Sequence, residues 1–289
     1  MSRITQKSAV APLNPWLNIS TGVPNQAFSA IPDNGAQPSS ATGFYYPGFQ
    51  SYVGQKFDTS DGRELVLVRA GAAALVPGKL MQGPAETTAF EKLAMTVPTA
   101  YPATAGLFQV LVTNGNTVLN VNQFAGGYFI VASSTGAGQI LKIASHQPAA
   151  ASATFVVTLE DPIQTTLSAT STVSLQNNPY DGIIVAPGGT ATGSLVGVSL
   201  YNIAASTAAT YNGTTGALTA NGVAQYGIIQ THGPVACLIA STTTIGYPLG
   251  PSQSVAGALT VATLTTAPQC AISSQTQTDA QYGQVFLQL

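Results

Sequence analysis

The amino-acid sequence predicts an all-β protein: an antiparallel β-sandwich or barrel framework with a small inserted β domain and an extended N-terminal arm. Its apolar residues come in short runs, such as those at 182–185, 195–200 and 226–230. Gly, Pro, Asn or Thr-rich segments close each run within about eight residues. None reaches the roughly 18 consecutive apolar residues that a membrane helix requires. Strands of about four to eight residues account for this pattern.

The expected strands follow one another at regular intervals. In residues 56–70, Asp61-Gly62 stands between two apolar-rich segments, which is a strong β-hairpin signal. Further strands are predicted at 107–112, 127–131, 139–143, 154–159 and 172–175. Spacings of roughly eight to twenty residues indicate an antiparallel sandwich or barrel. The only helix candidate is 85–95, which Thr87, Thr88 and flanking prolines limit to two turns at most.

Changes in composition divide the chain into four segments. Residues 1–53 form an arm rich in proline and aromatic residues, and 54–105 form the first part of the β framework. Residues 97–105 break the strand pattern with two prolines. We therefore place an inserted small β domain at 106–176 and the remainder of the framework at 177–289.

The N-terminal arm carries the candidate binding residues. Its prolines disfavour helix and sheet interiors, so the backbone is expected to be extended or turning. It also carries aromatic side chains, which bury large areas when they dock. These predicted partner-binding residues are Trp16, Phe28, Phe44, Tyr45, Tyr46, Phe49 and Tyr52. The arm either docks along a neighbouring subunit or packs on its own domain.

Charge is scarce and unevenly distributed. Only 6% of the 289 residues are charged, against about 25% in an ordinary soluble domain. No Asp, Glu, Lys or Arg occurs between Asp181 and Asp279. Such a chain suits a protein that hides much of its surface in an assembly. The net charge of −2 and the scattered Lys and Arg residues argue against a nucleic-acid partner.

The two cysteines and the N-terminal sequence bear on cellular location. Cys237 and Cys270 lack the spacing of a zinc site, and we interpret them as buried reduced thiols in preference to a disulfide. The first ten residues lack the apolar core of a secretory signal. The protein is therefore expected to be made in a cytoplasm and kept there until it joins an assembly.

Few residues offer catalytic or metal-binding chemistry. Glu160 and Asp161 are adjacent at a strand end, where their side chains point to opposite faces, so we interpret them as part of a turn. The acidic group at 58–64 is explained by hairpin chemistry, because calcium needs about six to eight oxygen ligands. His232 follows an apolar strand, and an orienting carboxylate for it would have to come from another strand. We predict no catalytic residue, metal site or cofactor.

Several segments carry a resemblance to a known family. They are 54–80, 141–146, 159–163, 178–185 and 226–238, the last reading Tyr-Gly-Ile-Ile-Gln-Thr-His-Gly-Pro-Val-Ala-Cys-Leu. In pattern and order they resemble tailed-bacteriophage virion structural proteins of the capsid decoration, or cement, type. The resemblance implies a non-enzymatic β-rich protein that binds the exterior of an icosahedral head and stabilises it, with its extended N-terminal arm clasping neighbouring capsid subunits. Its partners would be the major capsid protein and copies of itself, with a trimer the first expectation, and neither nucleic acid nor membrane.

Two other functions remain open. The chain could be a head-fibre or tail-fibre module that recognises host surface glycan, with Tyr180-Asp181 or Tyr201-Asn202 at loop tips. A fibre should also show sequence repeats or heptads, and neither occurs. A polysaccharide-cleaving enzyme is the third reading, which the scarcity of carboxylates after Asp181 disfavours.

Overall fold

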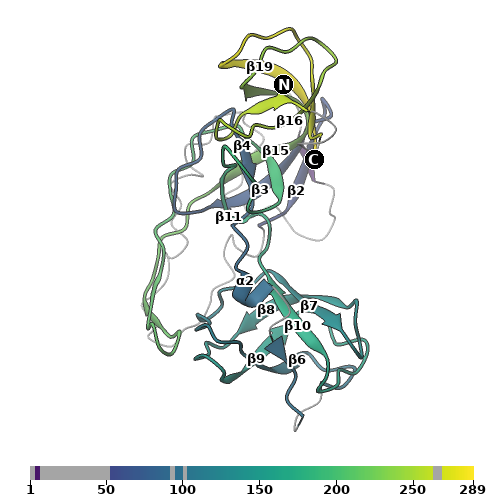
Figure 1. The fold of residues 1–289 in the computed structure, drawn as a ribbon, viewed down its shortest axis with the longest axis vertical. Coiled ribbons are helices and arrows are strands. Elements are labelled where there is room, and N and C mark those ends of the chain that lie inside the picture. Colours follow the sequence, from purple (N-terminus) through teal and green to yellow (C-terminus); the bar gives the residue numbers. More distant parts are fainter. Residues whose placement is uncertain (1–3, 7–52, 92–94, 100–102, 263–268) are drawn as a thin grey trace. The chain divides into compact units, whose positions relative to one another are not determined.

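A computed structural model describes residues 4–6, 53–91, 95–99, 103–262 and 269–289. The chain divides into two compact units. Unit 1 comprises 1–84, 179–207 and 223–289, and unit 2 comprises 85–178 and 208–222. Figure 1 shows the strands that make up both units. The predicted all-β class is confirmed, with barrel-like and sandwich-like sheets.

Unit 1 is organised around one long strand, β15 (Tyr226–Ile239). Its N-terminal half pairs with β3 (Glu64–Ala70) and with β12 (Leu195–Ser199). The remaining pairings run from β3 to β11 (Asp181–Val185), from β11 to β4 (Leu80–Gln82) and from β4 to β12. These five strands close on themselves, and we call them the first ring.

The C-terminal half of β15 belongs to a second ring. It pairs with β19 (Gln281–Gln288) on one side and with β17 (Leu259–Val261) on the other. β16 (Pro248–Pro251) and β18 (Ala271–Ser273) complete the circuit between β17 and β19. One continuous strand thus supplies a wall to each ring. The apolar cluster of the first ring includes Met81 and Ile229, and the cluster of the second ring also takes in Leu80 of β4 and Val198 of β12.

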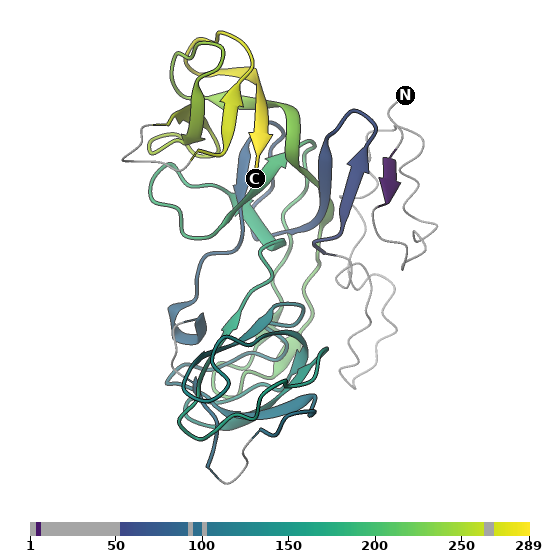
Figure 2. The ribbon, with the colours of Figure 1, turned by 90° about the vertical axis from the view of Figure 1, so that its right-hand side faces the viewer.

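The predicted hairpin extends the first ring outward. β2 (Lys56–Thr59) pairs with β3 in antiparallel register, with Asp58 opposite Glu64. Gly62 in the turn has a φ of 81°, a conformation that glycine adopts without strain. The other edge of β2 pairs with β1 (Ile4–Gln6), and Figure 2 shows β1 beside β2. The Asp61-Gly62 prediction is therefore confirmed.

Unit 2 is a closed antiparallel barrel of six strands. In order around the barrel these are β10 (Thr172–Gln176), β5 (Met95–Thr96), β6 (Gln109–Thr113), β9 (Thr154–Leu159), β8 (Ile140–His146) and β7 (Tyr128–Ser133). Buried residues alternate along β6, β8 and β9, as expected where one face lines a core. The five strands predicted between 107 and 175 all belong to this barrel.

Two further elements complete unit 2. α2 (Thr88–Glu91) is a single turn within the candidate helix at 85–95, and the Glu91 carboxylate accepts a hydrogen bond from the Thr87 amide at 3.0 Å. The hairpin of β13 (Thr210–Tyr211) and β14 (Leu218–Ala220) comes from residues 208–222. At its tip, the Gly216 carbonyl accepts a hydrogen bond from the Val121 amide at 3.0 Å.

The boundaries of the two units differ from those of the predicted segments. The inserted domain was expected at 106–176, whereas unit 2 begins at Ala85, ends its main segment at Asn178 and recruits 208–222. The chain therefore crosses between the units four times. The hairpin at 208–222 carries no composition change that distinguishes it from its neighbours.

Candidate functional site

The predicted binding residues of the arm fall outside the part of the chain that the structure describes. They are Trp16, Phe28, Phe44, Tyr45, Tyr46, Phe49 and Tyr52. The assignment of these aromatics to a partner interface stays a prediction. Candidate sites among the described residues lie in unit 1, along β15, and in the barrel of unit 2.

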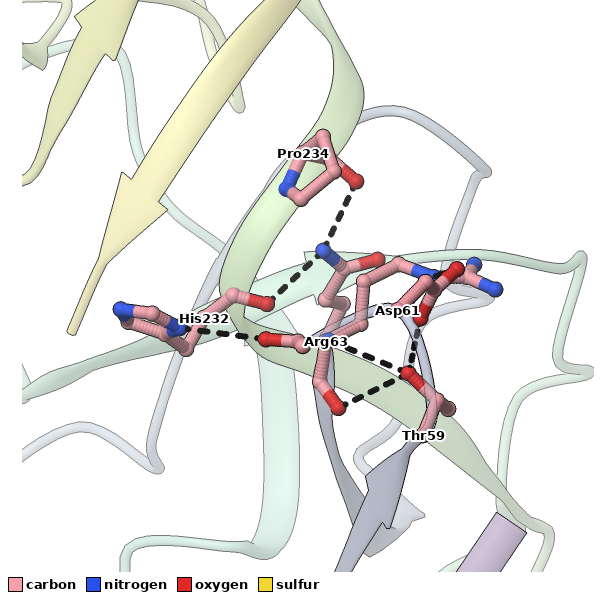
Figure 3. A network of polar contacts seen from close by, with 7 residues as sticks. Thr59, Asp61, Arg63, His232 and Pro234 are labelled. Carbon is pink, nitrogen blue, oxygen red and sulfur yellow. Dashed lines mark hydrogen bonds and ion pairs between the residues drawn. The ribbon is translucent and has the colours of Figure 1, made fainter. Parts of the chain in front are cut away.

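The structure brings His232 to the β2–β3 hairpin (Figure 3). On β15, His232 stands opposite Glu64 of β3, although 167 residues separate them. The His232 Nδ1 atom lies 3.4 Å from the Gly62 carbonyl oxygen, to which it can donate a hydrogen bond. The adjacent Gln230 amide donates to the carbonyls of His232 and Pro234, each at 2.9 Å. The His232–Gly62 contact therefore links the strand to the turn, whereas the two Gln230 contacts lie within β15.

The hairpin turn has its own polar network. The Asp61 carboxylate accepts hydrogen bonds from the Thr59 hydroxyl and, at 2.9 Å, from the Arg63 Nε atom. The hydrogen bond from Thr59, together with the Arg63 charge, holds the pKa of Asp61 below its usual value. Asp61 thus serves the turn, as the sequence interpretation expected. Its carboxylate does not contact the His232 ring in the way that a catalytic triad requires.

The imidazole of His232 also meets an aromatic side chain. Its ring lies edge-on to Phe286 of β19, with centroids 5.1 Å apart and an interplanar angle of 87°. Edge-to-face contacts of this kind are favourable because the ring edge is positive and the ring face negative. His232 therefore joins the hairpin turn to the outward side of β19.

That outward side exposes two aromatic side chains of unit 1. Along β19 the exposed positions alternate with buried ones, and Tyr282 and Phe286 are 51% and 37% exposed. Registered opposite them on β15 are Leu238 and Pro234, respectively. We call this surface the uncharged face and define it as Tyr282, Gln284, Phe286 and Gln288 of β19, Pro234, Ala236 and Leu238 of β15, and Ile272 of β18.

The uncharged face has an unusual composition for an outward sheet surface. Lys and Glu normally populate such positions and keep a sheet soluble. Here aromatic rings, aliphatic side chains, proline and Gln amides take their place, and β15, β16, β18 and β19 contain no Asp, Glu, Lys or Arg. The opposite side of the same sheet is the second ring's core, with Val235, Val285 and Leu287. The surface therefore presents apolar side chains and neutral amides, and no Asp, Glu, Lys or Arg side chain.

The other chemistry-bearing residues serve the cores. His146 lies in the barrel, where its Nε2 atom accepts a hydrogen bond from the Phe124 amide at 3.0 Å and its Nδ1 atom lies 2.9 Å from the Gln147 carbonyl. Both contacts are satisfied by the neutral ring with its hydrogen on Nδ1. Burial lowers the pKa of His146 to about 4.

The cysteines and the acidic pair have ordinary surroundings. Cys237 and Cys270 are free and buried in the second ring's core, as the sequence interpretation expected, and burial raises the pKa of both thiols. Glu160 lies 3.4 Å from Lys142 in an exposed ion pair on the barrel. Within the described ranges, no group of three or more His, Cys, Asp or Glu residues is placed to hold a metal ion.

Comparison of the chain with protein-family models, with curated proteins and with solved structures finds no match. Among the residues that the structure describes, no helix has the length and apolar content needed to cross a membrane.

Sequence reasoning missed the uncharged face. The signal was present in residues 281–288, where Gly283, Val285 and Leu287 alternate with Tyr282 and Phe286. Successive residues of a strand point to opposite faces of the sheet. When both faces of a strand carry apolar side chains and one face is exposed, the strand presents an apolar surface to solvent. Only the fold shows which of the two faces of β19 is exposed.

Proposed function

We propose that this protein is a structural component of a phage virion that binds the exterior of the capsid and stabilises it. The observation that carries the proposal is the uncharged face of β15, β18 and β19, which exposes Tyr282 and Phe286 without a charged neighbour on those strands. The resemblance of segments such as 226–238 to decoration proteins supports the same function. The face would contact the major capsid protein.

The chemistry of this face suits a permanent protein contact. Burying an ion pair requires both charges to lose their water, and that cost can exceed their mutual attraction. A face of Tyr, Phe, Pro, Ile and Leu avoids this cost, and its Gln amides can hydrogen-bond to the backbone of a partner. Aromatic residues are also enriched at the centres of protein interfaces.

The symmetry of a capsid would allow many individually weak contacts to give strong binding. A capsid presents the same surface many times, and copies that contact both the shell and one another bind with combined strength. Each copy then needs no reactive group. A structural role of this kind accords with the positions of His146, Cys237 and Cys270, which are buried in cores.

Recognition of a neutral host glycan is the second candidate, and one observation favours it. Tyr282 and Phe286 lie beside Gln284 and Gln288 on one exposed strand. Exposed aromatic rings stack on sugars, and amides hydrogen-bond to hydroxyl groups. This candidate assigns the same face to a different ligand, so the two functions can be separated by experiment.

Co-sedimentation with expanded phage heads that lack this chain tests the proposal. The purified protein should pellet with heads, and a Y282S/F286S variant should bind at least about tenfold more weakly, since truncated aromatic anchors commonly cost more than about 1 kcal/mol each. I140S is the matched control, because Ile140 is a barrel residue that is 60% exposed. It should bind as the parent chain does.

Two results would contradict the capsid assignment. One is a parent chain that does not pellet with heads at any concentration. The other is equal binding by the parent and the Y282S/F286S variant. Retention of the parent, but not of this variant, on immobilised neutral host polysaccharide would instead favour the glycan function.

A further inference from the structure

The first ring has one sheet edge whose partner strand comes from the far N-terminus. β2 pairs with β3 along one side, and β1 covers the other side with Ile4 opposite Thr59, Thr5 opposite Asp58 and Gln6 opposite Phe57. β1 has only three residues. Without β1, β2 would be an edge strand that offers its backbone groups to another chain.

The connection between β1 and β2 is long. About 50 residues separate Gln6 from Lys56, and the entropy cost of closing a loop grows with its length. A chain of this length can extend to roughly 160 Å, far enough to reach a neighbouring molecule. Pairing of β1 with β2 of its own chain therefore carries the entropy cost of closing this long connection.

We propose that β1 exchanges between copies, so that residues 4–6 of one molecule pair with β2 of another. The backbone pairing is the same in both arrangements, because an identical strand replaces the chain's own strand. The idea that copies stand close enough to exchange rests on the proposed function, since decoration of a shell holds many copies side by side. The partner is then a second copy of this chain.

The register supplies a direct test by disulfide formation. The Thr59 amide donates to the Arg63 carbonyl at 2.9 Å, so the backbone groups of Thr59 face β3. Thr59 and Ile4 therefore form a pair without backbone hydrogen bonds to each other, the type in which opposite residues approach most closely. Cysteines at these two positions are well placed to form a disulfide.

The experiment uses single-cysteine substitutions in the full chain. I4C and T59C are unfolded together, refolded at high protein concentration and oxidised, and the products are separated without reductant. A disulfide between the two variants can join only different molecules, so exchange predicts a covalent heterodimer. The native Cys237 and Cys270 are buried and are present in every sample. I4C mixed with Q284C, which has its cysteine on exposed β19, measures random cross-linking.

The double variant I4C/T59C makes each outcome decisive. A heterodimer from I4C and T59C at several times the yield of the I4C and Q284C mixture supports exchange. An internal disulfide in the double variant, without a heterodimer from the mixture, shows that β1 stays on its own chain and overturns the proposal. Failure of both pairs also overturns it, provided that the hairpin control D58C/E64C forms its internal disulfide. No capsid is involved, so these results are independent of capsid binding.

Discussion

The barrel of unit 2 and the second ring of unit 1 have similar interiors and different exteriors. Each is a closed circuit of strands around a buried apolar cluster, which in the barrel includes Phe90, Phe124, Phe129 and Phe155 and in the second ring is aliphatic apart from two cysteines. The barrel carries an exposed ion pair at 3.4 Å between Lys142 of β8 and Glu160, which directly follows β9, and it also exposes Ile140, whereas the second ring exposes Tyr282 and Phe286 without a charged residue on its strands. The barrel shows that this chain can carry charges on outward strand positions. The absence of charged residues from the strands of the second ring is therefore a property of that ring and not of outward strand positions in general.

The largest expected effect concerns the barrel core. Phe155 is 1% exposed and packs against His146, with ring centroids 6.1 Å apart. F155A should lower the free energy of unfolding of the barrel by about 3–5 kcal/mol, because it removes a large side chain and leaves a cavity. Hydrogen exchange followed by mass spectrometry should show faster exchange in 103–178 and little change in 269–289.

The neighbouring residue supplies the control for this substitution. Val156 lies on the same strand and is partly exposed, so V156A should cost less than about 1 kcal/mol. Equal loss of protection in both units after F155A would contradict the view that the two cores are separate.

The second prediction uses acid to destabilise the barrel selectively. In the unfolded chain His146 has its ordinary pKa of 6.5, and in the folded barrel burial lowers the pKa to about 4. Above pH 6.5 neither state is protonated, and the full stability is present. Between pH 6.5 and 4 only the unfolded state binds the proton, so the barrel loses up to about 3 kcal/mol as the pH falls.

Urea denaturation of the barrel between pH 7 and 4 measures this loss. Replacing His146 by Gln should lower the stability at pH 7 and remove most of the dependence on pH. A variant that keeps the full pH dependence would show that other groups cause it. The second ring contains no histidine in its core, so its unfolding should change less over the same range.

The third prediction adds a charge to each exterior. Q284E places a carboxylate on the uncharged face, and Q109E places one on the outside of barrel strand β6. Q284E should weaken binding to expanded heads at least about tenfold, since an unpaired carboxylate would lose water at the interface. Q109E should leave binding unchanged in the same co-sedimentation assay. Equal weakening by both variants would indicate a general charge effect.

The smallest expected effect concerns the barrel's exposed ion pair. Lys142 and Glu160 are both largely accessible to solvent, so their attraction is screened by water and salt. E160Q should change the free energy of unfolding by less than about 0.5 kcal/mol, as measured by urea denaturation. A loss above about 1 kcal/mol would show that the outward charges of the barrel stabilise its fold, which would remove the contrast with the second ring.

Local features of the fold could be predicted from the sequence, and long-range pairings could not. Asp61-Gly62 specifies a hairpin because its turn conformation depends on adjacent residues. The barrel strands were predicted from short apolar runs that turn residues separate at regular spacing. No local pattern indicates that 226–239 forms one strand of 14 residues shared by two rings, since Gly233 and Pro234 in its middle suggest an interruption.

In the candidate site, too, the sequence predicted local features but not the long-range contacts. The sequence indicated that any partner of His232 must come from another strand, but only the β3–β15 register brings the hairpin turn beside it. Tyr282 and Phe286 were not predicted, because their exposure depends on which side of β19 faces the core. The arm aromatics from Trp16 to Tyr52 lie outside the described residues, and their role stays a prediction.

Cryo-electron microscopy of the virion tests the central claim most directly. The account predicts density for this chain on the head exterior, with Tyr282 and Phe286 buried against the capsid protein and the barrel's Lys142–Glu160 pair left in solvent. Density for the chain only in a tail or fibre would contradict the account. Density on the head with the uncharged face exposed to solvent would contradict the role assigned to that face.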